Sequence, residues 1–257
     1  MRARKIIPGI DSRLLIKDAA KLMPEASRRG FLRGAASLGA LAFLTGCDII
    51  DGDTAEGVLR RVSEFNDGAQ ALLFSRSKLA PEFPESAITR PFPFNAYYDK
   101  DEAPVVDPAT YKLEVAGLVN DKKPWTLQEL HALPEVSQIT RHVCVEGWSA
   151  IGSWQGASLA DFLKRIGADT HAKYVWFKCA EGYTNTIDMP TALHPQTQMS
   201  FKFDHKILPR AYGFPMKIRI PTKLGFKNPK YVVAMEVTNT DKGGYWENQG
   251  YNWFSGL

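Results

Sequence analysis

The sequence predicts an α+β fold, in which mixed sheets of short strands carry a few peripheral helices. Short segments with the alternating or β-branched pattern of strands outnumber the helical segments, and the helical segments are unevenly spaced along the chain. A doubly wound α/β fold would alternate strands and helices regularly. The prediction is therefore one domain at residues 95–257, preceded by a helix and a proline-rich extended segment at residues 58–94.

The preceding segment begins with a helical pattern over residues 58–74. Apolar side chains recur there at spacings of three and four residues, which places them on one face of a helix. They are Leu59, Val62, Phe65, Ala69, Leu72 and Leu73. Prolines at positions 81, 84, 91 and 93 then exclude regular structure. We expect this part to cross the domain as an extended chain that ends in the aromatic cluster at residues 94–99.

Within the domain, alternation and β-branched content predict several short strands. They lie at residues 111–116, 137–145, 173–179, 216–220 and 231–237. Two short helices are predicted from their capping residues. Thr126 and Glu129 form a capping box, and Ser158 begins a second helix that Gly167 ends.

The N-terminal residues have the pattern of an export signal. Arg28 and Arg29 form a twin-arginine motif, and the apolar run at residues 34–46 is too short to cross a bilayer. The run ends in Leu-Thr-Gly before Cys47, which is typical of a bacterial lipobox whose cysteine is acylated. The alternatives are an uncleaved apolar anchor and an ordinary signal peptide cut nearby.

The export pattern predicts where the mature protein lies. We expect residues 1–46 to be a twin-arginine lipoprotein signal peptide and residues 47–57 to be a tether from the lipid to the domain. The protein would then lie on the periplasmic side of the inner membrane, with the lipid as its only membrane attachment. The twin-arginine route handles folded proteins, so it favours a cofactor inserted in the cytoplasm, although a fast-folding protein without a cofactor uses the same route.

Removal of the signal peptide changes what the charge means. The whole chain has a formal net charge of +4, but residues 1–46 hold nine of its 32 basic and three of its 28 acidic residues. The mature chain is left with 23 basic and 25 acidic residues, a net charge of −2. The composition therefore gives no reason to expect nucleic-acid binding.

Cys144 is the residue that most needs a chemical explanation. If Cys47 carries lipid, only Cys144 and Cys179 remain as thiols, and exported proteins normally pair their cysteines or omit them. Cys144 is either an inert, buried apolar residue or a thiolate ligand of a metal. Zinc is disfavoured, because no second pair of ligands completes a set of four with His142 and Cys144.

The segment at residues 217–230 carries cations and no acidic residue. The cations are Lys217, Arg219, Lys223, Lys227 and Lys230. On a strand, Lys217 and Arg219 share one face, while apolar residues take the other. We expect that face and the following turn to bind an anionic group such as a phosphate. The alternative is a solvated basic edge that blocks strand pairing.

Four separated segments between residues 90 and 257 carry a resemblance to a known family. They are Arg141-x-x-Cys144-Val145-Glu146-x-Trp148-Ser149 with Trp154-x-Gly156, Pro221-x-Lys223-x-Gly225-Phe226-Lys227, Ala192-Leu193-His194-Pro195, and Gly244-Tyr245-Trp246-Glu247 continuing to Trp253. Together they resemble the sulfite oxidase superfamily of molybdenum enzymes, specifically its bacterial periplasmic branch, which includes methionine sulfoxide reductases. The resemblance implies a sulfite-oxidase-type molybdopterin-binding domain. The chain ends where many members continue into a second, immunoglobulin-like dimerisation domain, so we expect that domain to be absent.

The resemblance also implies roles for individual residues. Cys144 would be the sole protein ligand of molybdenum, which a pyranopterin dithiolene also holds. Arg141 and His142 would help to hold an anionic site, and Glu146 would act close to the metal, so the implied catalytic residues are Cys144, Glu146 and Arg141. The residues at the family's cofactor-contacting positions are Asn95, Tyr98, Asp99, Cys144, Cys179, Tyr212, Lys217, Asn228, Pro229 and Lys230. At Cys179, Tyr212, Lys217 and the 228–230 segment the residue types differ from those of the related reductase.

The implied reaction is oxygen-atom transfer at molybdenum. We expect reduction of a sulfoxide or N-oxide with electrons from a membrane b-type haem protein. Sulfite oxidation that passes electrons to a soluble cytochrome is the alternative, and it usually needs more arginines around the anion than Arg141 and Arg219. A non-enzymatic lipoprotein that binds an anionic ligand or cofactor in the basic turn is an alternative of another class.

Overall fold

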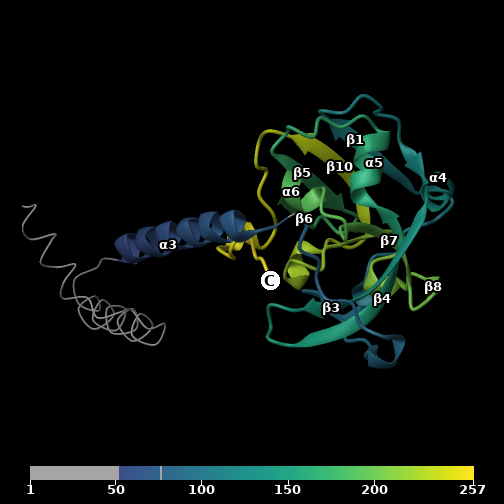
Figure 1. Ribbon diagram of the computed structural model, residues 1–257, viewed down its shortest axis with the longest axis horizontal. Helices are drawn as coiled ribbons and strands as arrows, with labels where there is room; N and C mark the ends of the chain where they lie inside the picture. Colours follow the sequence, from purple (N-terminus) through teal and green to yellow (C-terminus); the bar gives the residue numbers. More distant parts are fainter. Residues whose placement is uncertain (1–51, 76) are drawn as a thin grey trace, which may run out of the picture. The chain divides into compact units, whose positions relative to one another are not determined.

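The computed structural model describes residues 52–75 and 77–257 (Figure 1). The chain divides into two compact units, residues 1–59 and residues 60–257. The expected signal peptide and the lipobox with Cys47 lie outside the described residues. No helix in the described part of the chain is long and apolar enough to cross a membrane.

Two five-stranded sheets form the second unit. The first has the order β2–β1–β10–β5–β6, in which only the pair of β1 and β10 is parallel. Its strands are β1 (Lys112–Gly117), β2 (Trp125–Thr126), β5 (Tyr174–Cys179), β6 (Thr184–Asp188) and β10 (Val232–Thr238). The second sheet is antiparallel, with the order β3–β4–β7–β8 and with β9 also paired to β7. Its strands are β3 (Glu135–Val143), β4 (Ser149–Ser158), β7 (Gln198–Phe203), β8 (Lys206–Ile207) and β9 (Lys217–Arg219).

The helices in the described residues are few and mostly short. They are α3 (Gly52–Leu73), α4 (Leu127–His131), α5 (Leu159–Arg165) and α6 (Met189–Ala192), with 3-10 turns at Glu85–Ala87, Lys100–Glu102, Arg210–Tyr212, Gly225–Lys227 and Glu247–Gln249. Mixed sheets with a few peripheral helices confirm the predicted α+β class. All five predicted strands are present, with ends that differ from the predicted ones by at most two residues.

The predicted helix ends follow from their caps. The Thr126 side chain accepts a hydrogen bond from the Glu129 N–H at the start of α4, and the Ser158 side chain accepts one from the Asp161 N–H at the start of α5. Helix α3 begins at Gly52, six residues before the predicted start, so its first turns occupy the second half of the expected tether.

The main hydrophobic core lies between the two sheets and α5. Sheet residues such as Val175, Phe177 and Ile218 are fully buried there together with Leu159 and Leu163 of α5. A smaller cluster lies on the other side of β4. It contains Phe92, Ala150, Trp154, Phe203 and Leu208.

A long hairpin of β3 and β4 carries the Cys144 motif. Nine residue pairs, from Glu135 with Ala157 to Val143 with Ser149, join the two strands. Residues 144–148 form the connection at the tip. Figure 1 shows this hairpin as a curved, two-stranded ribbon that ends away from the first sheet. The fold thus places the motif at the end of a rigid element.

Candidate active site

The hairpin tip is a tight turn that buries Cys144. The Cys144 N–H donates to the Trp148 carbonyl over 2.9 Å, and the Gly147 N–H donates to the Cys144 carbonyl over 3.2 Å. Gly147 has a φ of 93°, which a side chain would strain. Cys144 is 7 % exposed, and burial raises the pKa of its thiol. The backbone therefore fixes the thiol at one position.

Glu146 turns back toward the thiol. Its Oε2 lies 3.7 Å from the Cys144 Sγ and accepts a hydrogen bond from the Trp148 Nε1 over 2.9 Å. The family resemblance implied that Glu146 lies close to the metal site, and the structure places it beside Cys144 together with Trp148. A carboxylate held in this way is a hydrogen-bond acceptor and proton carrier beside the thiol.

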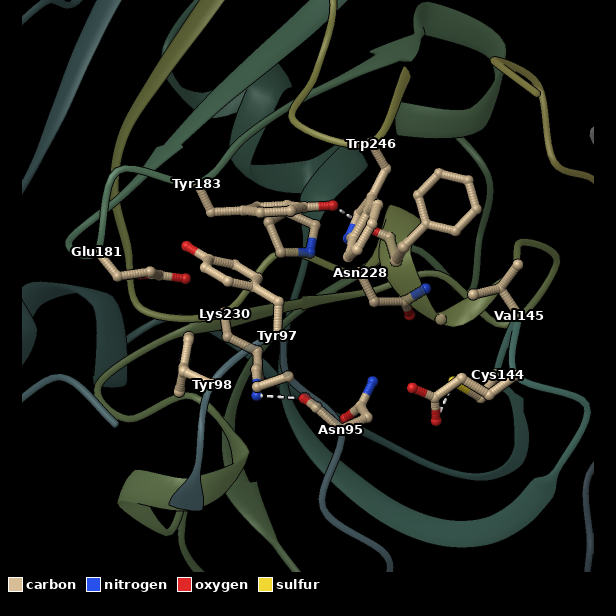
Figure 2. A pocket seen from close by; sticks show the side chains of 15 residues that line it. Asn95, Tyr97, Tyr98, Cys144, Val145, Glu181, Tyr183, Asn228, Lys230 and Trp246 are labelled. Carbon is tan, nitrogen blue, oxygen red and sulfur yellow. Dashed lines mark hydrogen bonds between the residues drawn. The ribbon is translucent and has the colours of Figure 1, made fainter. Parts of the chain in front are cut away.

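Cys144 and Glu146 line an open pocket with a cavity volume of about 90 Å³. Five separate segments of the chain contribute to it: the 95–98 segment, the hairpin tip, the turn between β5 and β6, the 225–230 segment and Trp246. Figure 2 shows Cys144 on one side of this pocket and Glu181 on the opposite side, with Asn95, Tyr97 and Lys230 between them. Aromatic rings and a few convergent polar groups line it, which is common for cofactor and substrate sites.

Three buried cations lie around this pocket, and one of them, Lys230, interacts electrostatically with Glu181 of the same lining. Lys217 is 2 % exposed and Arg219 is fully buried, which excludes the solvated basic edge considered above. Burial lowers the pKa of Lys217 well below its usual value, that of Arg219 to about 9 and that of Lys230 to about 8. Among the ion pairs of the described residues, none includes these three cations. Unpaired buried charge of one sign is costly, so this region fits an anionic group.

The three cations are held differently. Arg219 donates to the Asn228 Oδ1, the Thr140 Oγ1 and the Arg141 carbonyl over 2.9, 3.1 and 2.7 Å. Lys230 donates to the Asn95 carbonyl over 2.7 Å. The Lys217 ammonium lies 4.8 Å from the centre of the Trp154 ring. This ammonium donates no hydrogen bond to the described part of the chain. Lys217 is therefore the cation with the most unused donor capacity.

His142 and Arg141 do not supply the positive charge that the resemblance implied for them. His142 is fully buried, and burial together with Lys217 and Arg219 holds its pKa well below the usual value, so the imidazole is neutral. Arg141 lies on the opposite face of β3, is exposed, and stacks on the Phe83 ring at 5.3 Å. Its side chain is not among those that line the pocket.

The expected cofactor-contacting residues fall into two groups. Those that line the pocket with Cys144 are Asn95, Tyr98, Asn228, Pro229 and Lys230. The residues outside its lining are Asp99, Cys179, Tyr212 and Lys217. Asp99 is exposed at the start of a 3-10 turn, where its N–H donates to the Glu102 Oε2 over 3.2 Å. The hydroxyl of Tyr212 donates to the Phe92 carbonyl over 2.7 Å.

Cys179 ends β5 as a buried thiol that is 1 % exposed. Burial raises its pKa well above the usual value. Cys144 and Cys179 are both free thiols. In the described residues, no cluster of three His, Cys, Asp or Glu side chains could hold a metal ion.

Two cations of the basic segment stabilise the C-terminal segment. The Lys223 ammonium donates to the Phe254 carbonyl over 2.8 Å, and the Lys227 ammonium donates to the Thr186 carbonyl over 2.8 Å and pairs with the buried Glu247. Glu247 follows Trp246, which forms one wall of the pocket. The expectation that the whole turn offers lysines to an anion is therefore wrong for these two.

The structure adds pocket residues that the sequence did not indicate individually. The largest of them are Tyr97, Glu181, Tyr183 and Phe226. Burial raises the pKa of Glu181 to about 7, and its Oε2 is buried without a hydrogen-bond partner. A titrating carboxyl in a pocket is a common feature of enzyme sites. An acidic residue in a turn after a strand is too common a pattern to have signalled this position.

The comparison with protein families decides the classification. The model of the "Oxidoreductase molybdopterin binding domain" matches residues 100–246 of this chain. The chain belongs to this molybdopterin-binding oxidoreductase family. It is therefore an enzyme of the sulfite oxidase superfamily, and the alternative of a non-enzymatic binding lipoprotein is wrong.

Curated relatives agree with this classification. The "Putative protein-methionine-sulfoxide reductase subunit YedZ1" of Azospira oryzae is 58 % identical over 240 residues, which are 93 % of this chain and 92 % of that protein. The "Protein-methionine-sulfoxide reductase catalytic subunit MsrP" of Ralstonia nicotianae is 27 % identical over 63 % of this chain and 58 % of its own length. The mitochondrial sulfite oxidase of Drosophila melanogaster is 28 % identical over 59 % of this chain and only 31 % of its own length.

A solved structure supports the fold of this molybdopterin-binding oxidoreductase. The sulfane dehydrogenase SoxCD of Paracoccus pantotrophus superposes with a TM-score of 0.51 at 16 % identity, over 54 % of this chain and 40 % of that one. The structural likeness agrees with the predicted sulfite-oxidase-type domain. At this identity it concerns the fold alone.

Proposed function

We propose that this protein is a periplasmic molybdenum enzyme that reduces sulfoxides or N-oxides by removing their oxygen atom. One combination of features carries the proposal: a single buried thiol at the hairpin tip, next to buried cations that form no ion pair within the described residues. A thiolate suits a high-valent metal, and the cations suit an anionic pterin cofactor that holds the same metal. The names of the Azospira and Ralstonia relatives support a sulfoxide as the substrate.

The charge of the pocket favours a neutral substrate over sulfite. Lys230 is the only cation that lines the pocket in the described residues, and its ammonium is already bonded to the Asn95 carbonyl. Glu146 and Glu181 place two carboxyl groups on the same lining. Arg219, one of the two arginines considered for sulfite, has its guanidinium bound to neighbouring protein groups. Once an anionic pterin occupies Lys230, the lining within the described residues offers no further cation to a sulfite anion.

The residues of the chain have separable tasks in this reaction. The bound cofactor supplies a metal centre that exchanges an oxygen atom and two electrons with the substrate. Cys144 would hold the metal, while Lys217, Lys230 and Asn228 would hold the anionic pterin. Reduction of a sulfoxide to a sulfide and water consumes two protons, and Glu146 is the carboxyl group closest to Cys144 that could deliver them.

Aromatic side chains limit the access of water to the pocket. Tyr183 is held by a hydrogen bond from its hydroxyl to the Phe226 carbonyl over 2.6 Å, and Tyr97 stacks on Tyr245 with a centroid distance of 4.7 Å. Tyr97, Tyr183 and Trp246 form an aromatic wall of the pocket, across from Cys144 (Figure 2). An aromatic wall suits the thioether part of a sulfoxide substrate, because sulfur packs favourably on aromatic rings.

The location and the electron partner are part of the same proposal. The twin-arginine pattern and Cys47 support export and lipid anchoring on the periplasmic side of the inner membrane. A lipid-anchored reductase would receive its electrons from a membrane b-type haem protein. Sulfite oxidation with a soluble cytochrome as the acceptor is the second candidate reaction.

Metal analysis combined with two assays tests the proposal. Protein made in a host that synthesises the cofactor should contain about one molybdenum per chain. It should oxidise reduced viologen when methionine sulfoxide is added. Activity only with sulfite and ferricyanide would reverse the proposed direction, and folded protein without molybdenum would refute the proposal.

A matched pair of variants tests the ligand. Cys144→Ala should lose activity, whereas Cys179→Ala, which removes the other buried thiol, should keep it. Full activity of Cys144→Ala would refute the assignment of Cys144 as the protein ligand of the metal.

A further inference from the structure

Helix α3 exposes large apolar side chains to solvent. In the part of α3 that belongs to the domain, Phe65 is 74 % exposed, Leu72 is 86 % exposed and Leu73 is 83 % exposed. Val62 is 51 % exposed, one turn before Phe65. Isolated exposed apolar residues are ordinary, but a contiguous group of large ones indicates a surface that something covers.

The polar side of α3, by contrast, contacts the domain. Asp67 accepts hydrogen bonds from the backbone N–H groups of Phe254 and Trp253 over 2.6 and 3.3 Å. Gln70 accepts one from the Gly256 N–H over 2.8 Å. The Phe74 ring, just after the helix, packs edge-on against Phe254 at 5.8 Å. The helix is thus attached through polar groups, the reverse of the usual packing of an amphipathic helix.

Helical periodicity joins the exposed residues into one stripe, in which only Ala69 is half-buried. Residues Val58, Val62, Phe65, Ala69 and Leu72 follow one another at spacings of four and three, which keeps them on one side of the helix. We call them, with Leu73, the apolar stripe. Asp67 and Gln70 lie on the other side, so the attachment of α3 to the domain leaves the stripe uncovered.

We propose that the apolar stripe of α3 lies in the interfacial layer of the membrane that anchors the protein. The inference rests on the proposed acylation of Cys47. Helix α3 begins five residues after Cys47, and five residues reach about 18 Å at most. An acylated Cys47 therefore keeps the start of α3 at the headgroup region of the bilayer, where amphipathic helices insert their apolar face.

The charges of α3 agree with this arrangement. The acidic side chains Glu64 and Asp67 lie outside the apolar stripe, so insertion of the stripe buries no carboxylate. Arg61 lies next to the stripe, where a cation contacts lipid phosphates. Helix α3 is bonded to residues 253–256, which follow the pocket residue Trp246 in the chain. Contact of α3 with the bilayer would therefore set the distance of the pocket from the membrane.

Site-directed spin labels on the acylated, full-length protein in liposomes test the inference. Cys144 and Cys179 are buried, so labels introduced through Phe65→Cys and Leu72→Cys report the stripe alone. Glu64→Cys and Ala71→Cys are the matched controls, since both residues are exposed on the other side of α3. We expect relaxation by oxygen to exceed relaxation by a water-soluble nickel chelate at the stripe, and the reverse at the controls.

The outcomes separate the possible occupants. Equal access of the nickel chelate to all four labels would overturn the inference. Exclusion of both oxygen and nickel from the stripe would show a protein surface there, either a second copy or a partner, and would also overturn it.

The anchor and the enzyme are measured separately on the same samples. Mass spectrometry of the peptide that contains Cys47 tests the acylation, and the viologen assay tests the proposed reaction. A normal lipid on Cys47 and normal activity with water-exposed stripe labels would refute only the membrane contact of α3. Lipid-exposed labels in a protein without sulfoxide reductase activity would refute only the proposed reaction.

Discussion

Replacement of Lys217 by methionine should have opposite effects on the empty and the cofactor-loaded protein. Lys217 is 2 % exposed on β9, has no acidic partner in the described residues, and contacts the Trp154 ring at 4.8 Å. Methionine has a similar length and shape and carries no charge, so Lys217→Met removes the ammonium while filling most of the same space.

The size of each effect follows from the interactions that the Lys217 ammonium makes in the empty and in the cofactor-loaded protein. In the empty protein, removal of a buried, unpaired charge should stabilise the fold by about 1–4 kcal/mol, and loss of the cation–π contact offsets up to about 2 kcal/mol of this. A net gain of about 2 kcal/mol raises the Tm of a domain of this size by about 4–8 °C. In the loaded protein, loss of a charge-assisted hydrogen bond worth about 1.5–3 kcal/mol should weaken cofactor retention about 10- to 100-fold.

Thermal unfolding measures the predicted stabilisation of the empty protein, and molybdenum retention measures the predicted loss of cofactor binding. The empty protein is prepared in a host that lacks the cofactor, the loaded protein in a host that makes it, and retained molybdenum is measured after dialysis. Lys206→Met on the exposed strand β8 is the control and should change neither quantity. A lower Tm for the empty Lys217→Met protein, or unchanged molybdenum retention by the loaded one, would refute the view that Lys217 is buried to hold an anion.

Three further substitutions test packing and charge. Gly156→Ala would place a Cβ 1.9 Å from the Met199 carbonyl oxygen, so it should separate β4 from β7 and cost about 3 kcal/mol in urea unfolding. Glu247→Gln leaves Lys227 buried without its counter-charge and should destabilise by about 3–5 kcal/mol, whereas a double variant with Lys227→Met should recover much of that loss. Burial raises the pKa of Glu181 to about 7, so the folded protein holds this proton more tightly than the unfolded chain does. The free energy of unfolding should therefore fall by about 2 kcal/mol as the pH rises from about 4.5 to 7, a value already reduced for the partial exposure of Glu181. Urea titrations at several pH values measure this fall, and Glu181→Gln should abolish it.

The predictable parts of the fold were those with local signals. The capping box at Thr126 and the Ser158 cap gave the starts of α4 and α5, because a cap is satisfied within a few residues of sequence. The strands around residues 173–179 and 231–237 were predicted because both carry β-branched or aromatic residues, and they pair in the central part of the first sheet.

The unpredicted parts depend on contacts between distant segments. Strand β4 was missed because glycine, serine and alanine dominate its sequence, yet it pairs with strands on both sides. Gly156 is required there, since the Met199 backbone passes too close for a side chain. In the same way Glu181 enters the pocket only because the turn after β5 lies beside the 95–98 segment, which no local pattern predicts.

The position of the cations shows most clearly what tertiary structure added. The alternation of β9 correctly separated Lys217 and Arg219 from their apolar neighbours, but a three-residue strand covered on both faces buries charged and apolar residues alike. Whether a charged face of a strand meets solvent or the interior is decided by what packs on it. Here Trp154 and the hairpin of β3 and β4 cover it.

These buried cations connect the fold to the proposed export route. Without an anionic group they raise the free energy of the folded domain, and with one bound the binding free energy adds to stability, so cofactor insertion and folding should favour each other. A chain that reaches full stability only when loaded must acquire its cofactor where the cofactor is made. The twin-arginine pattern at residues 27–33 is typical of proteins that cross the membrane already folded, so the proposed export route and the buried cations would both favour cofactor insertion before export.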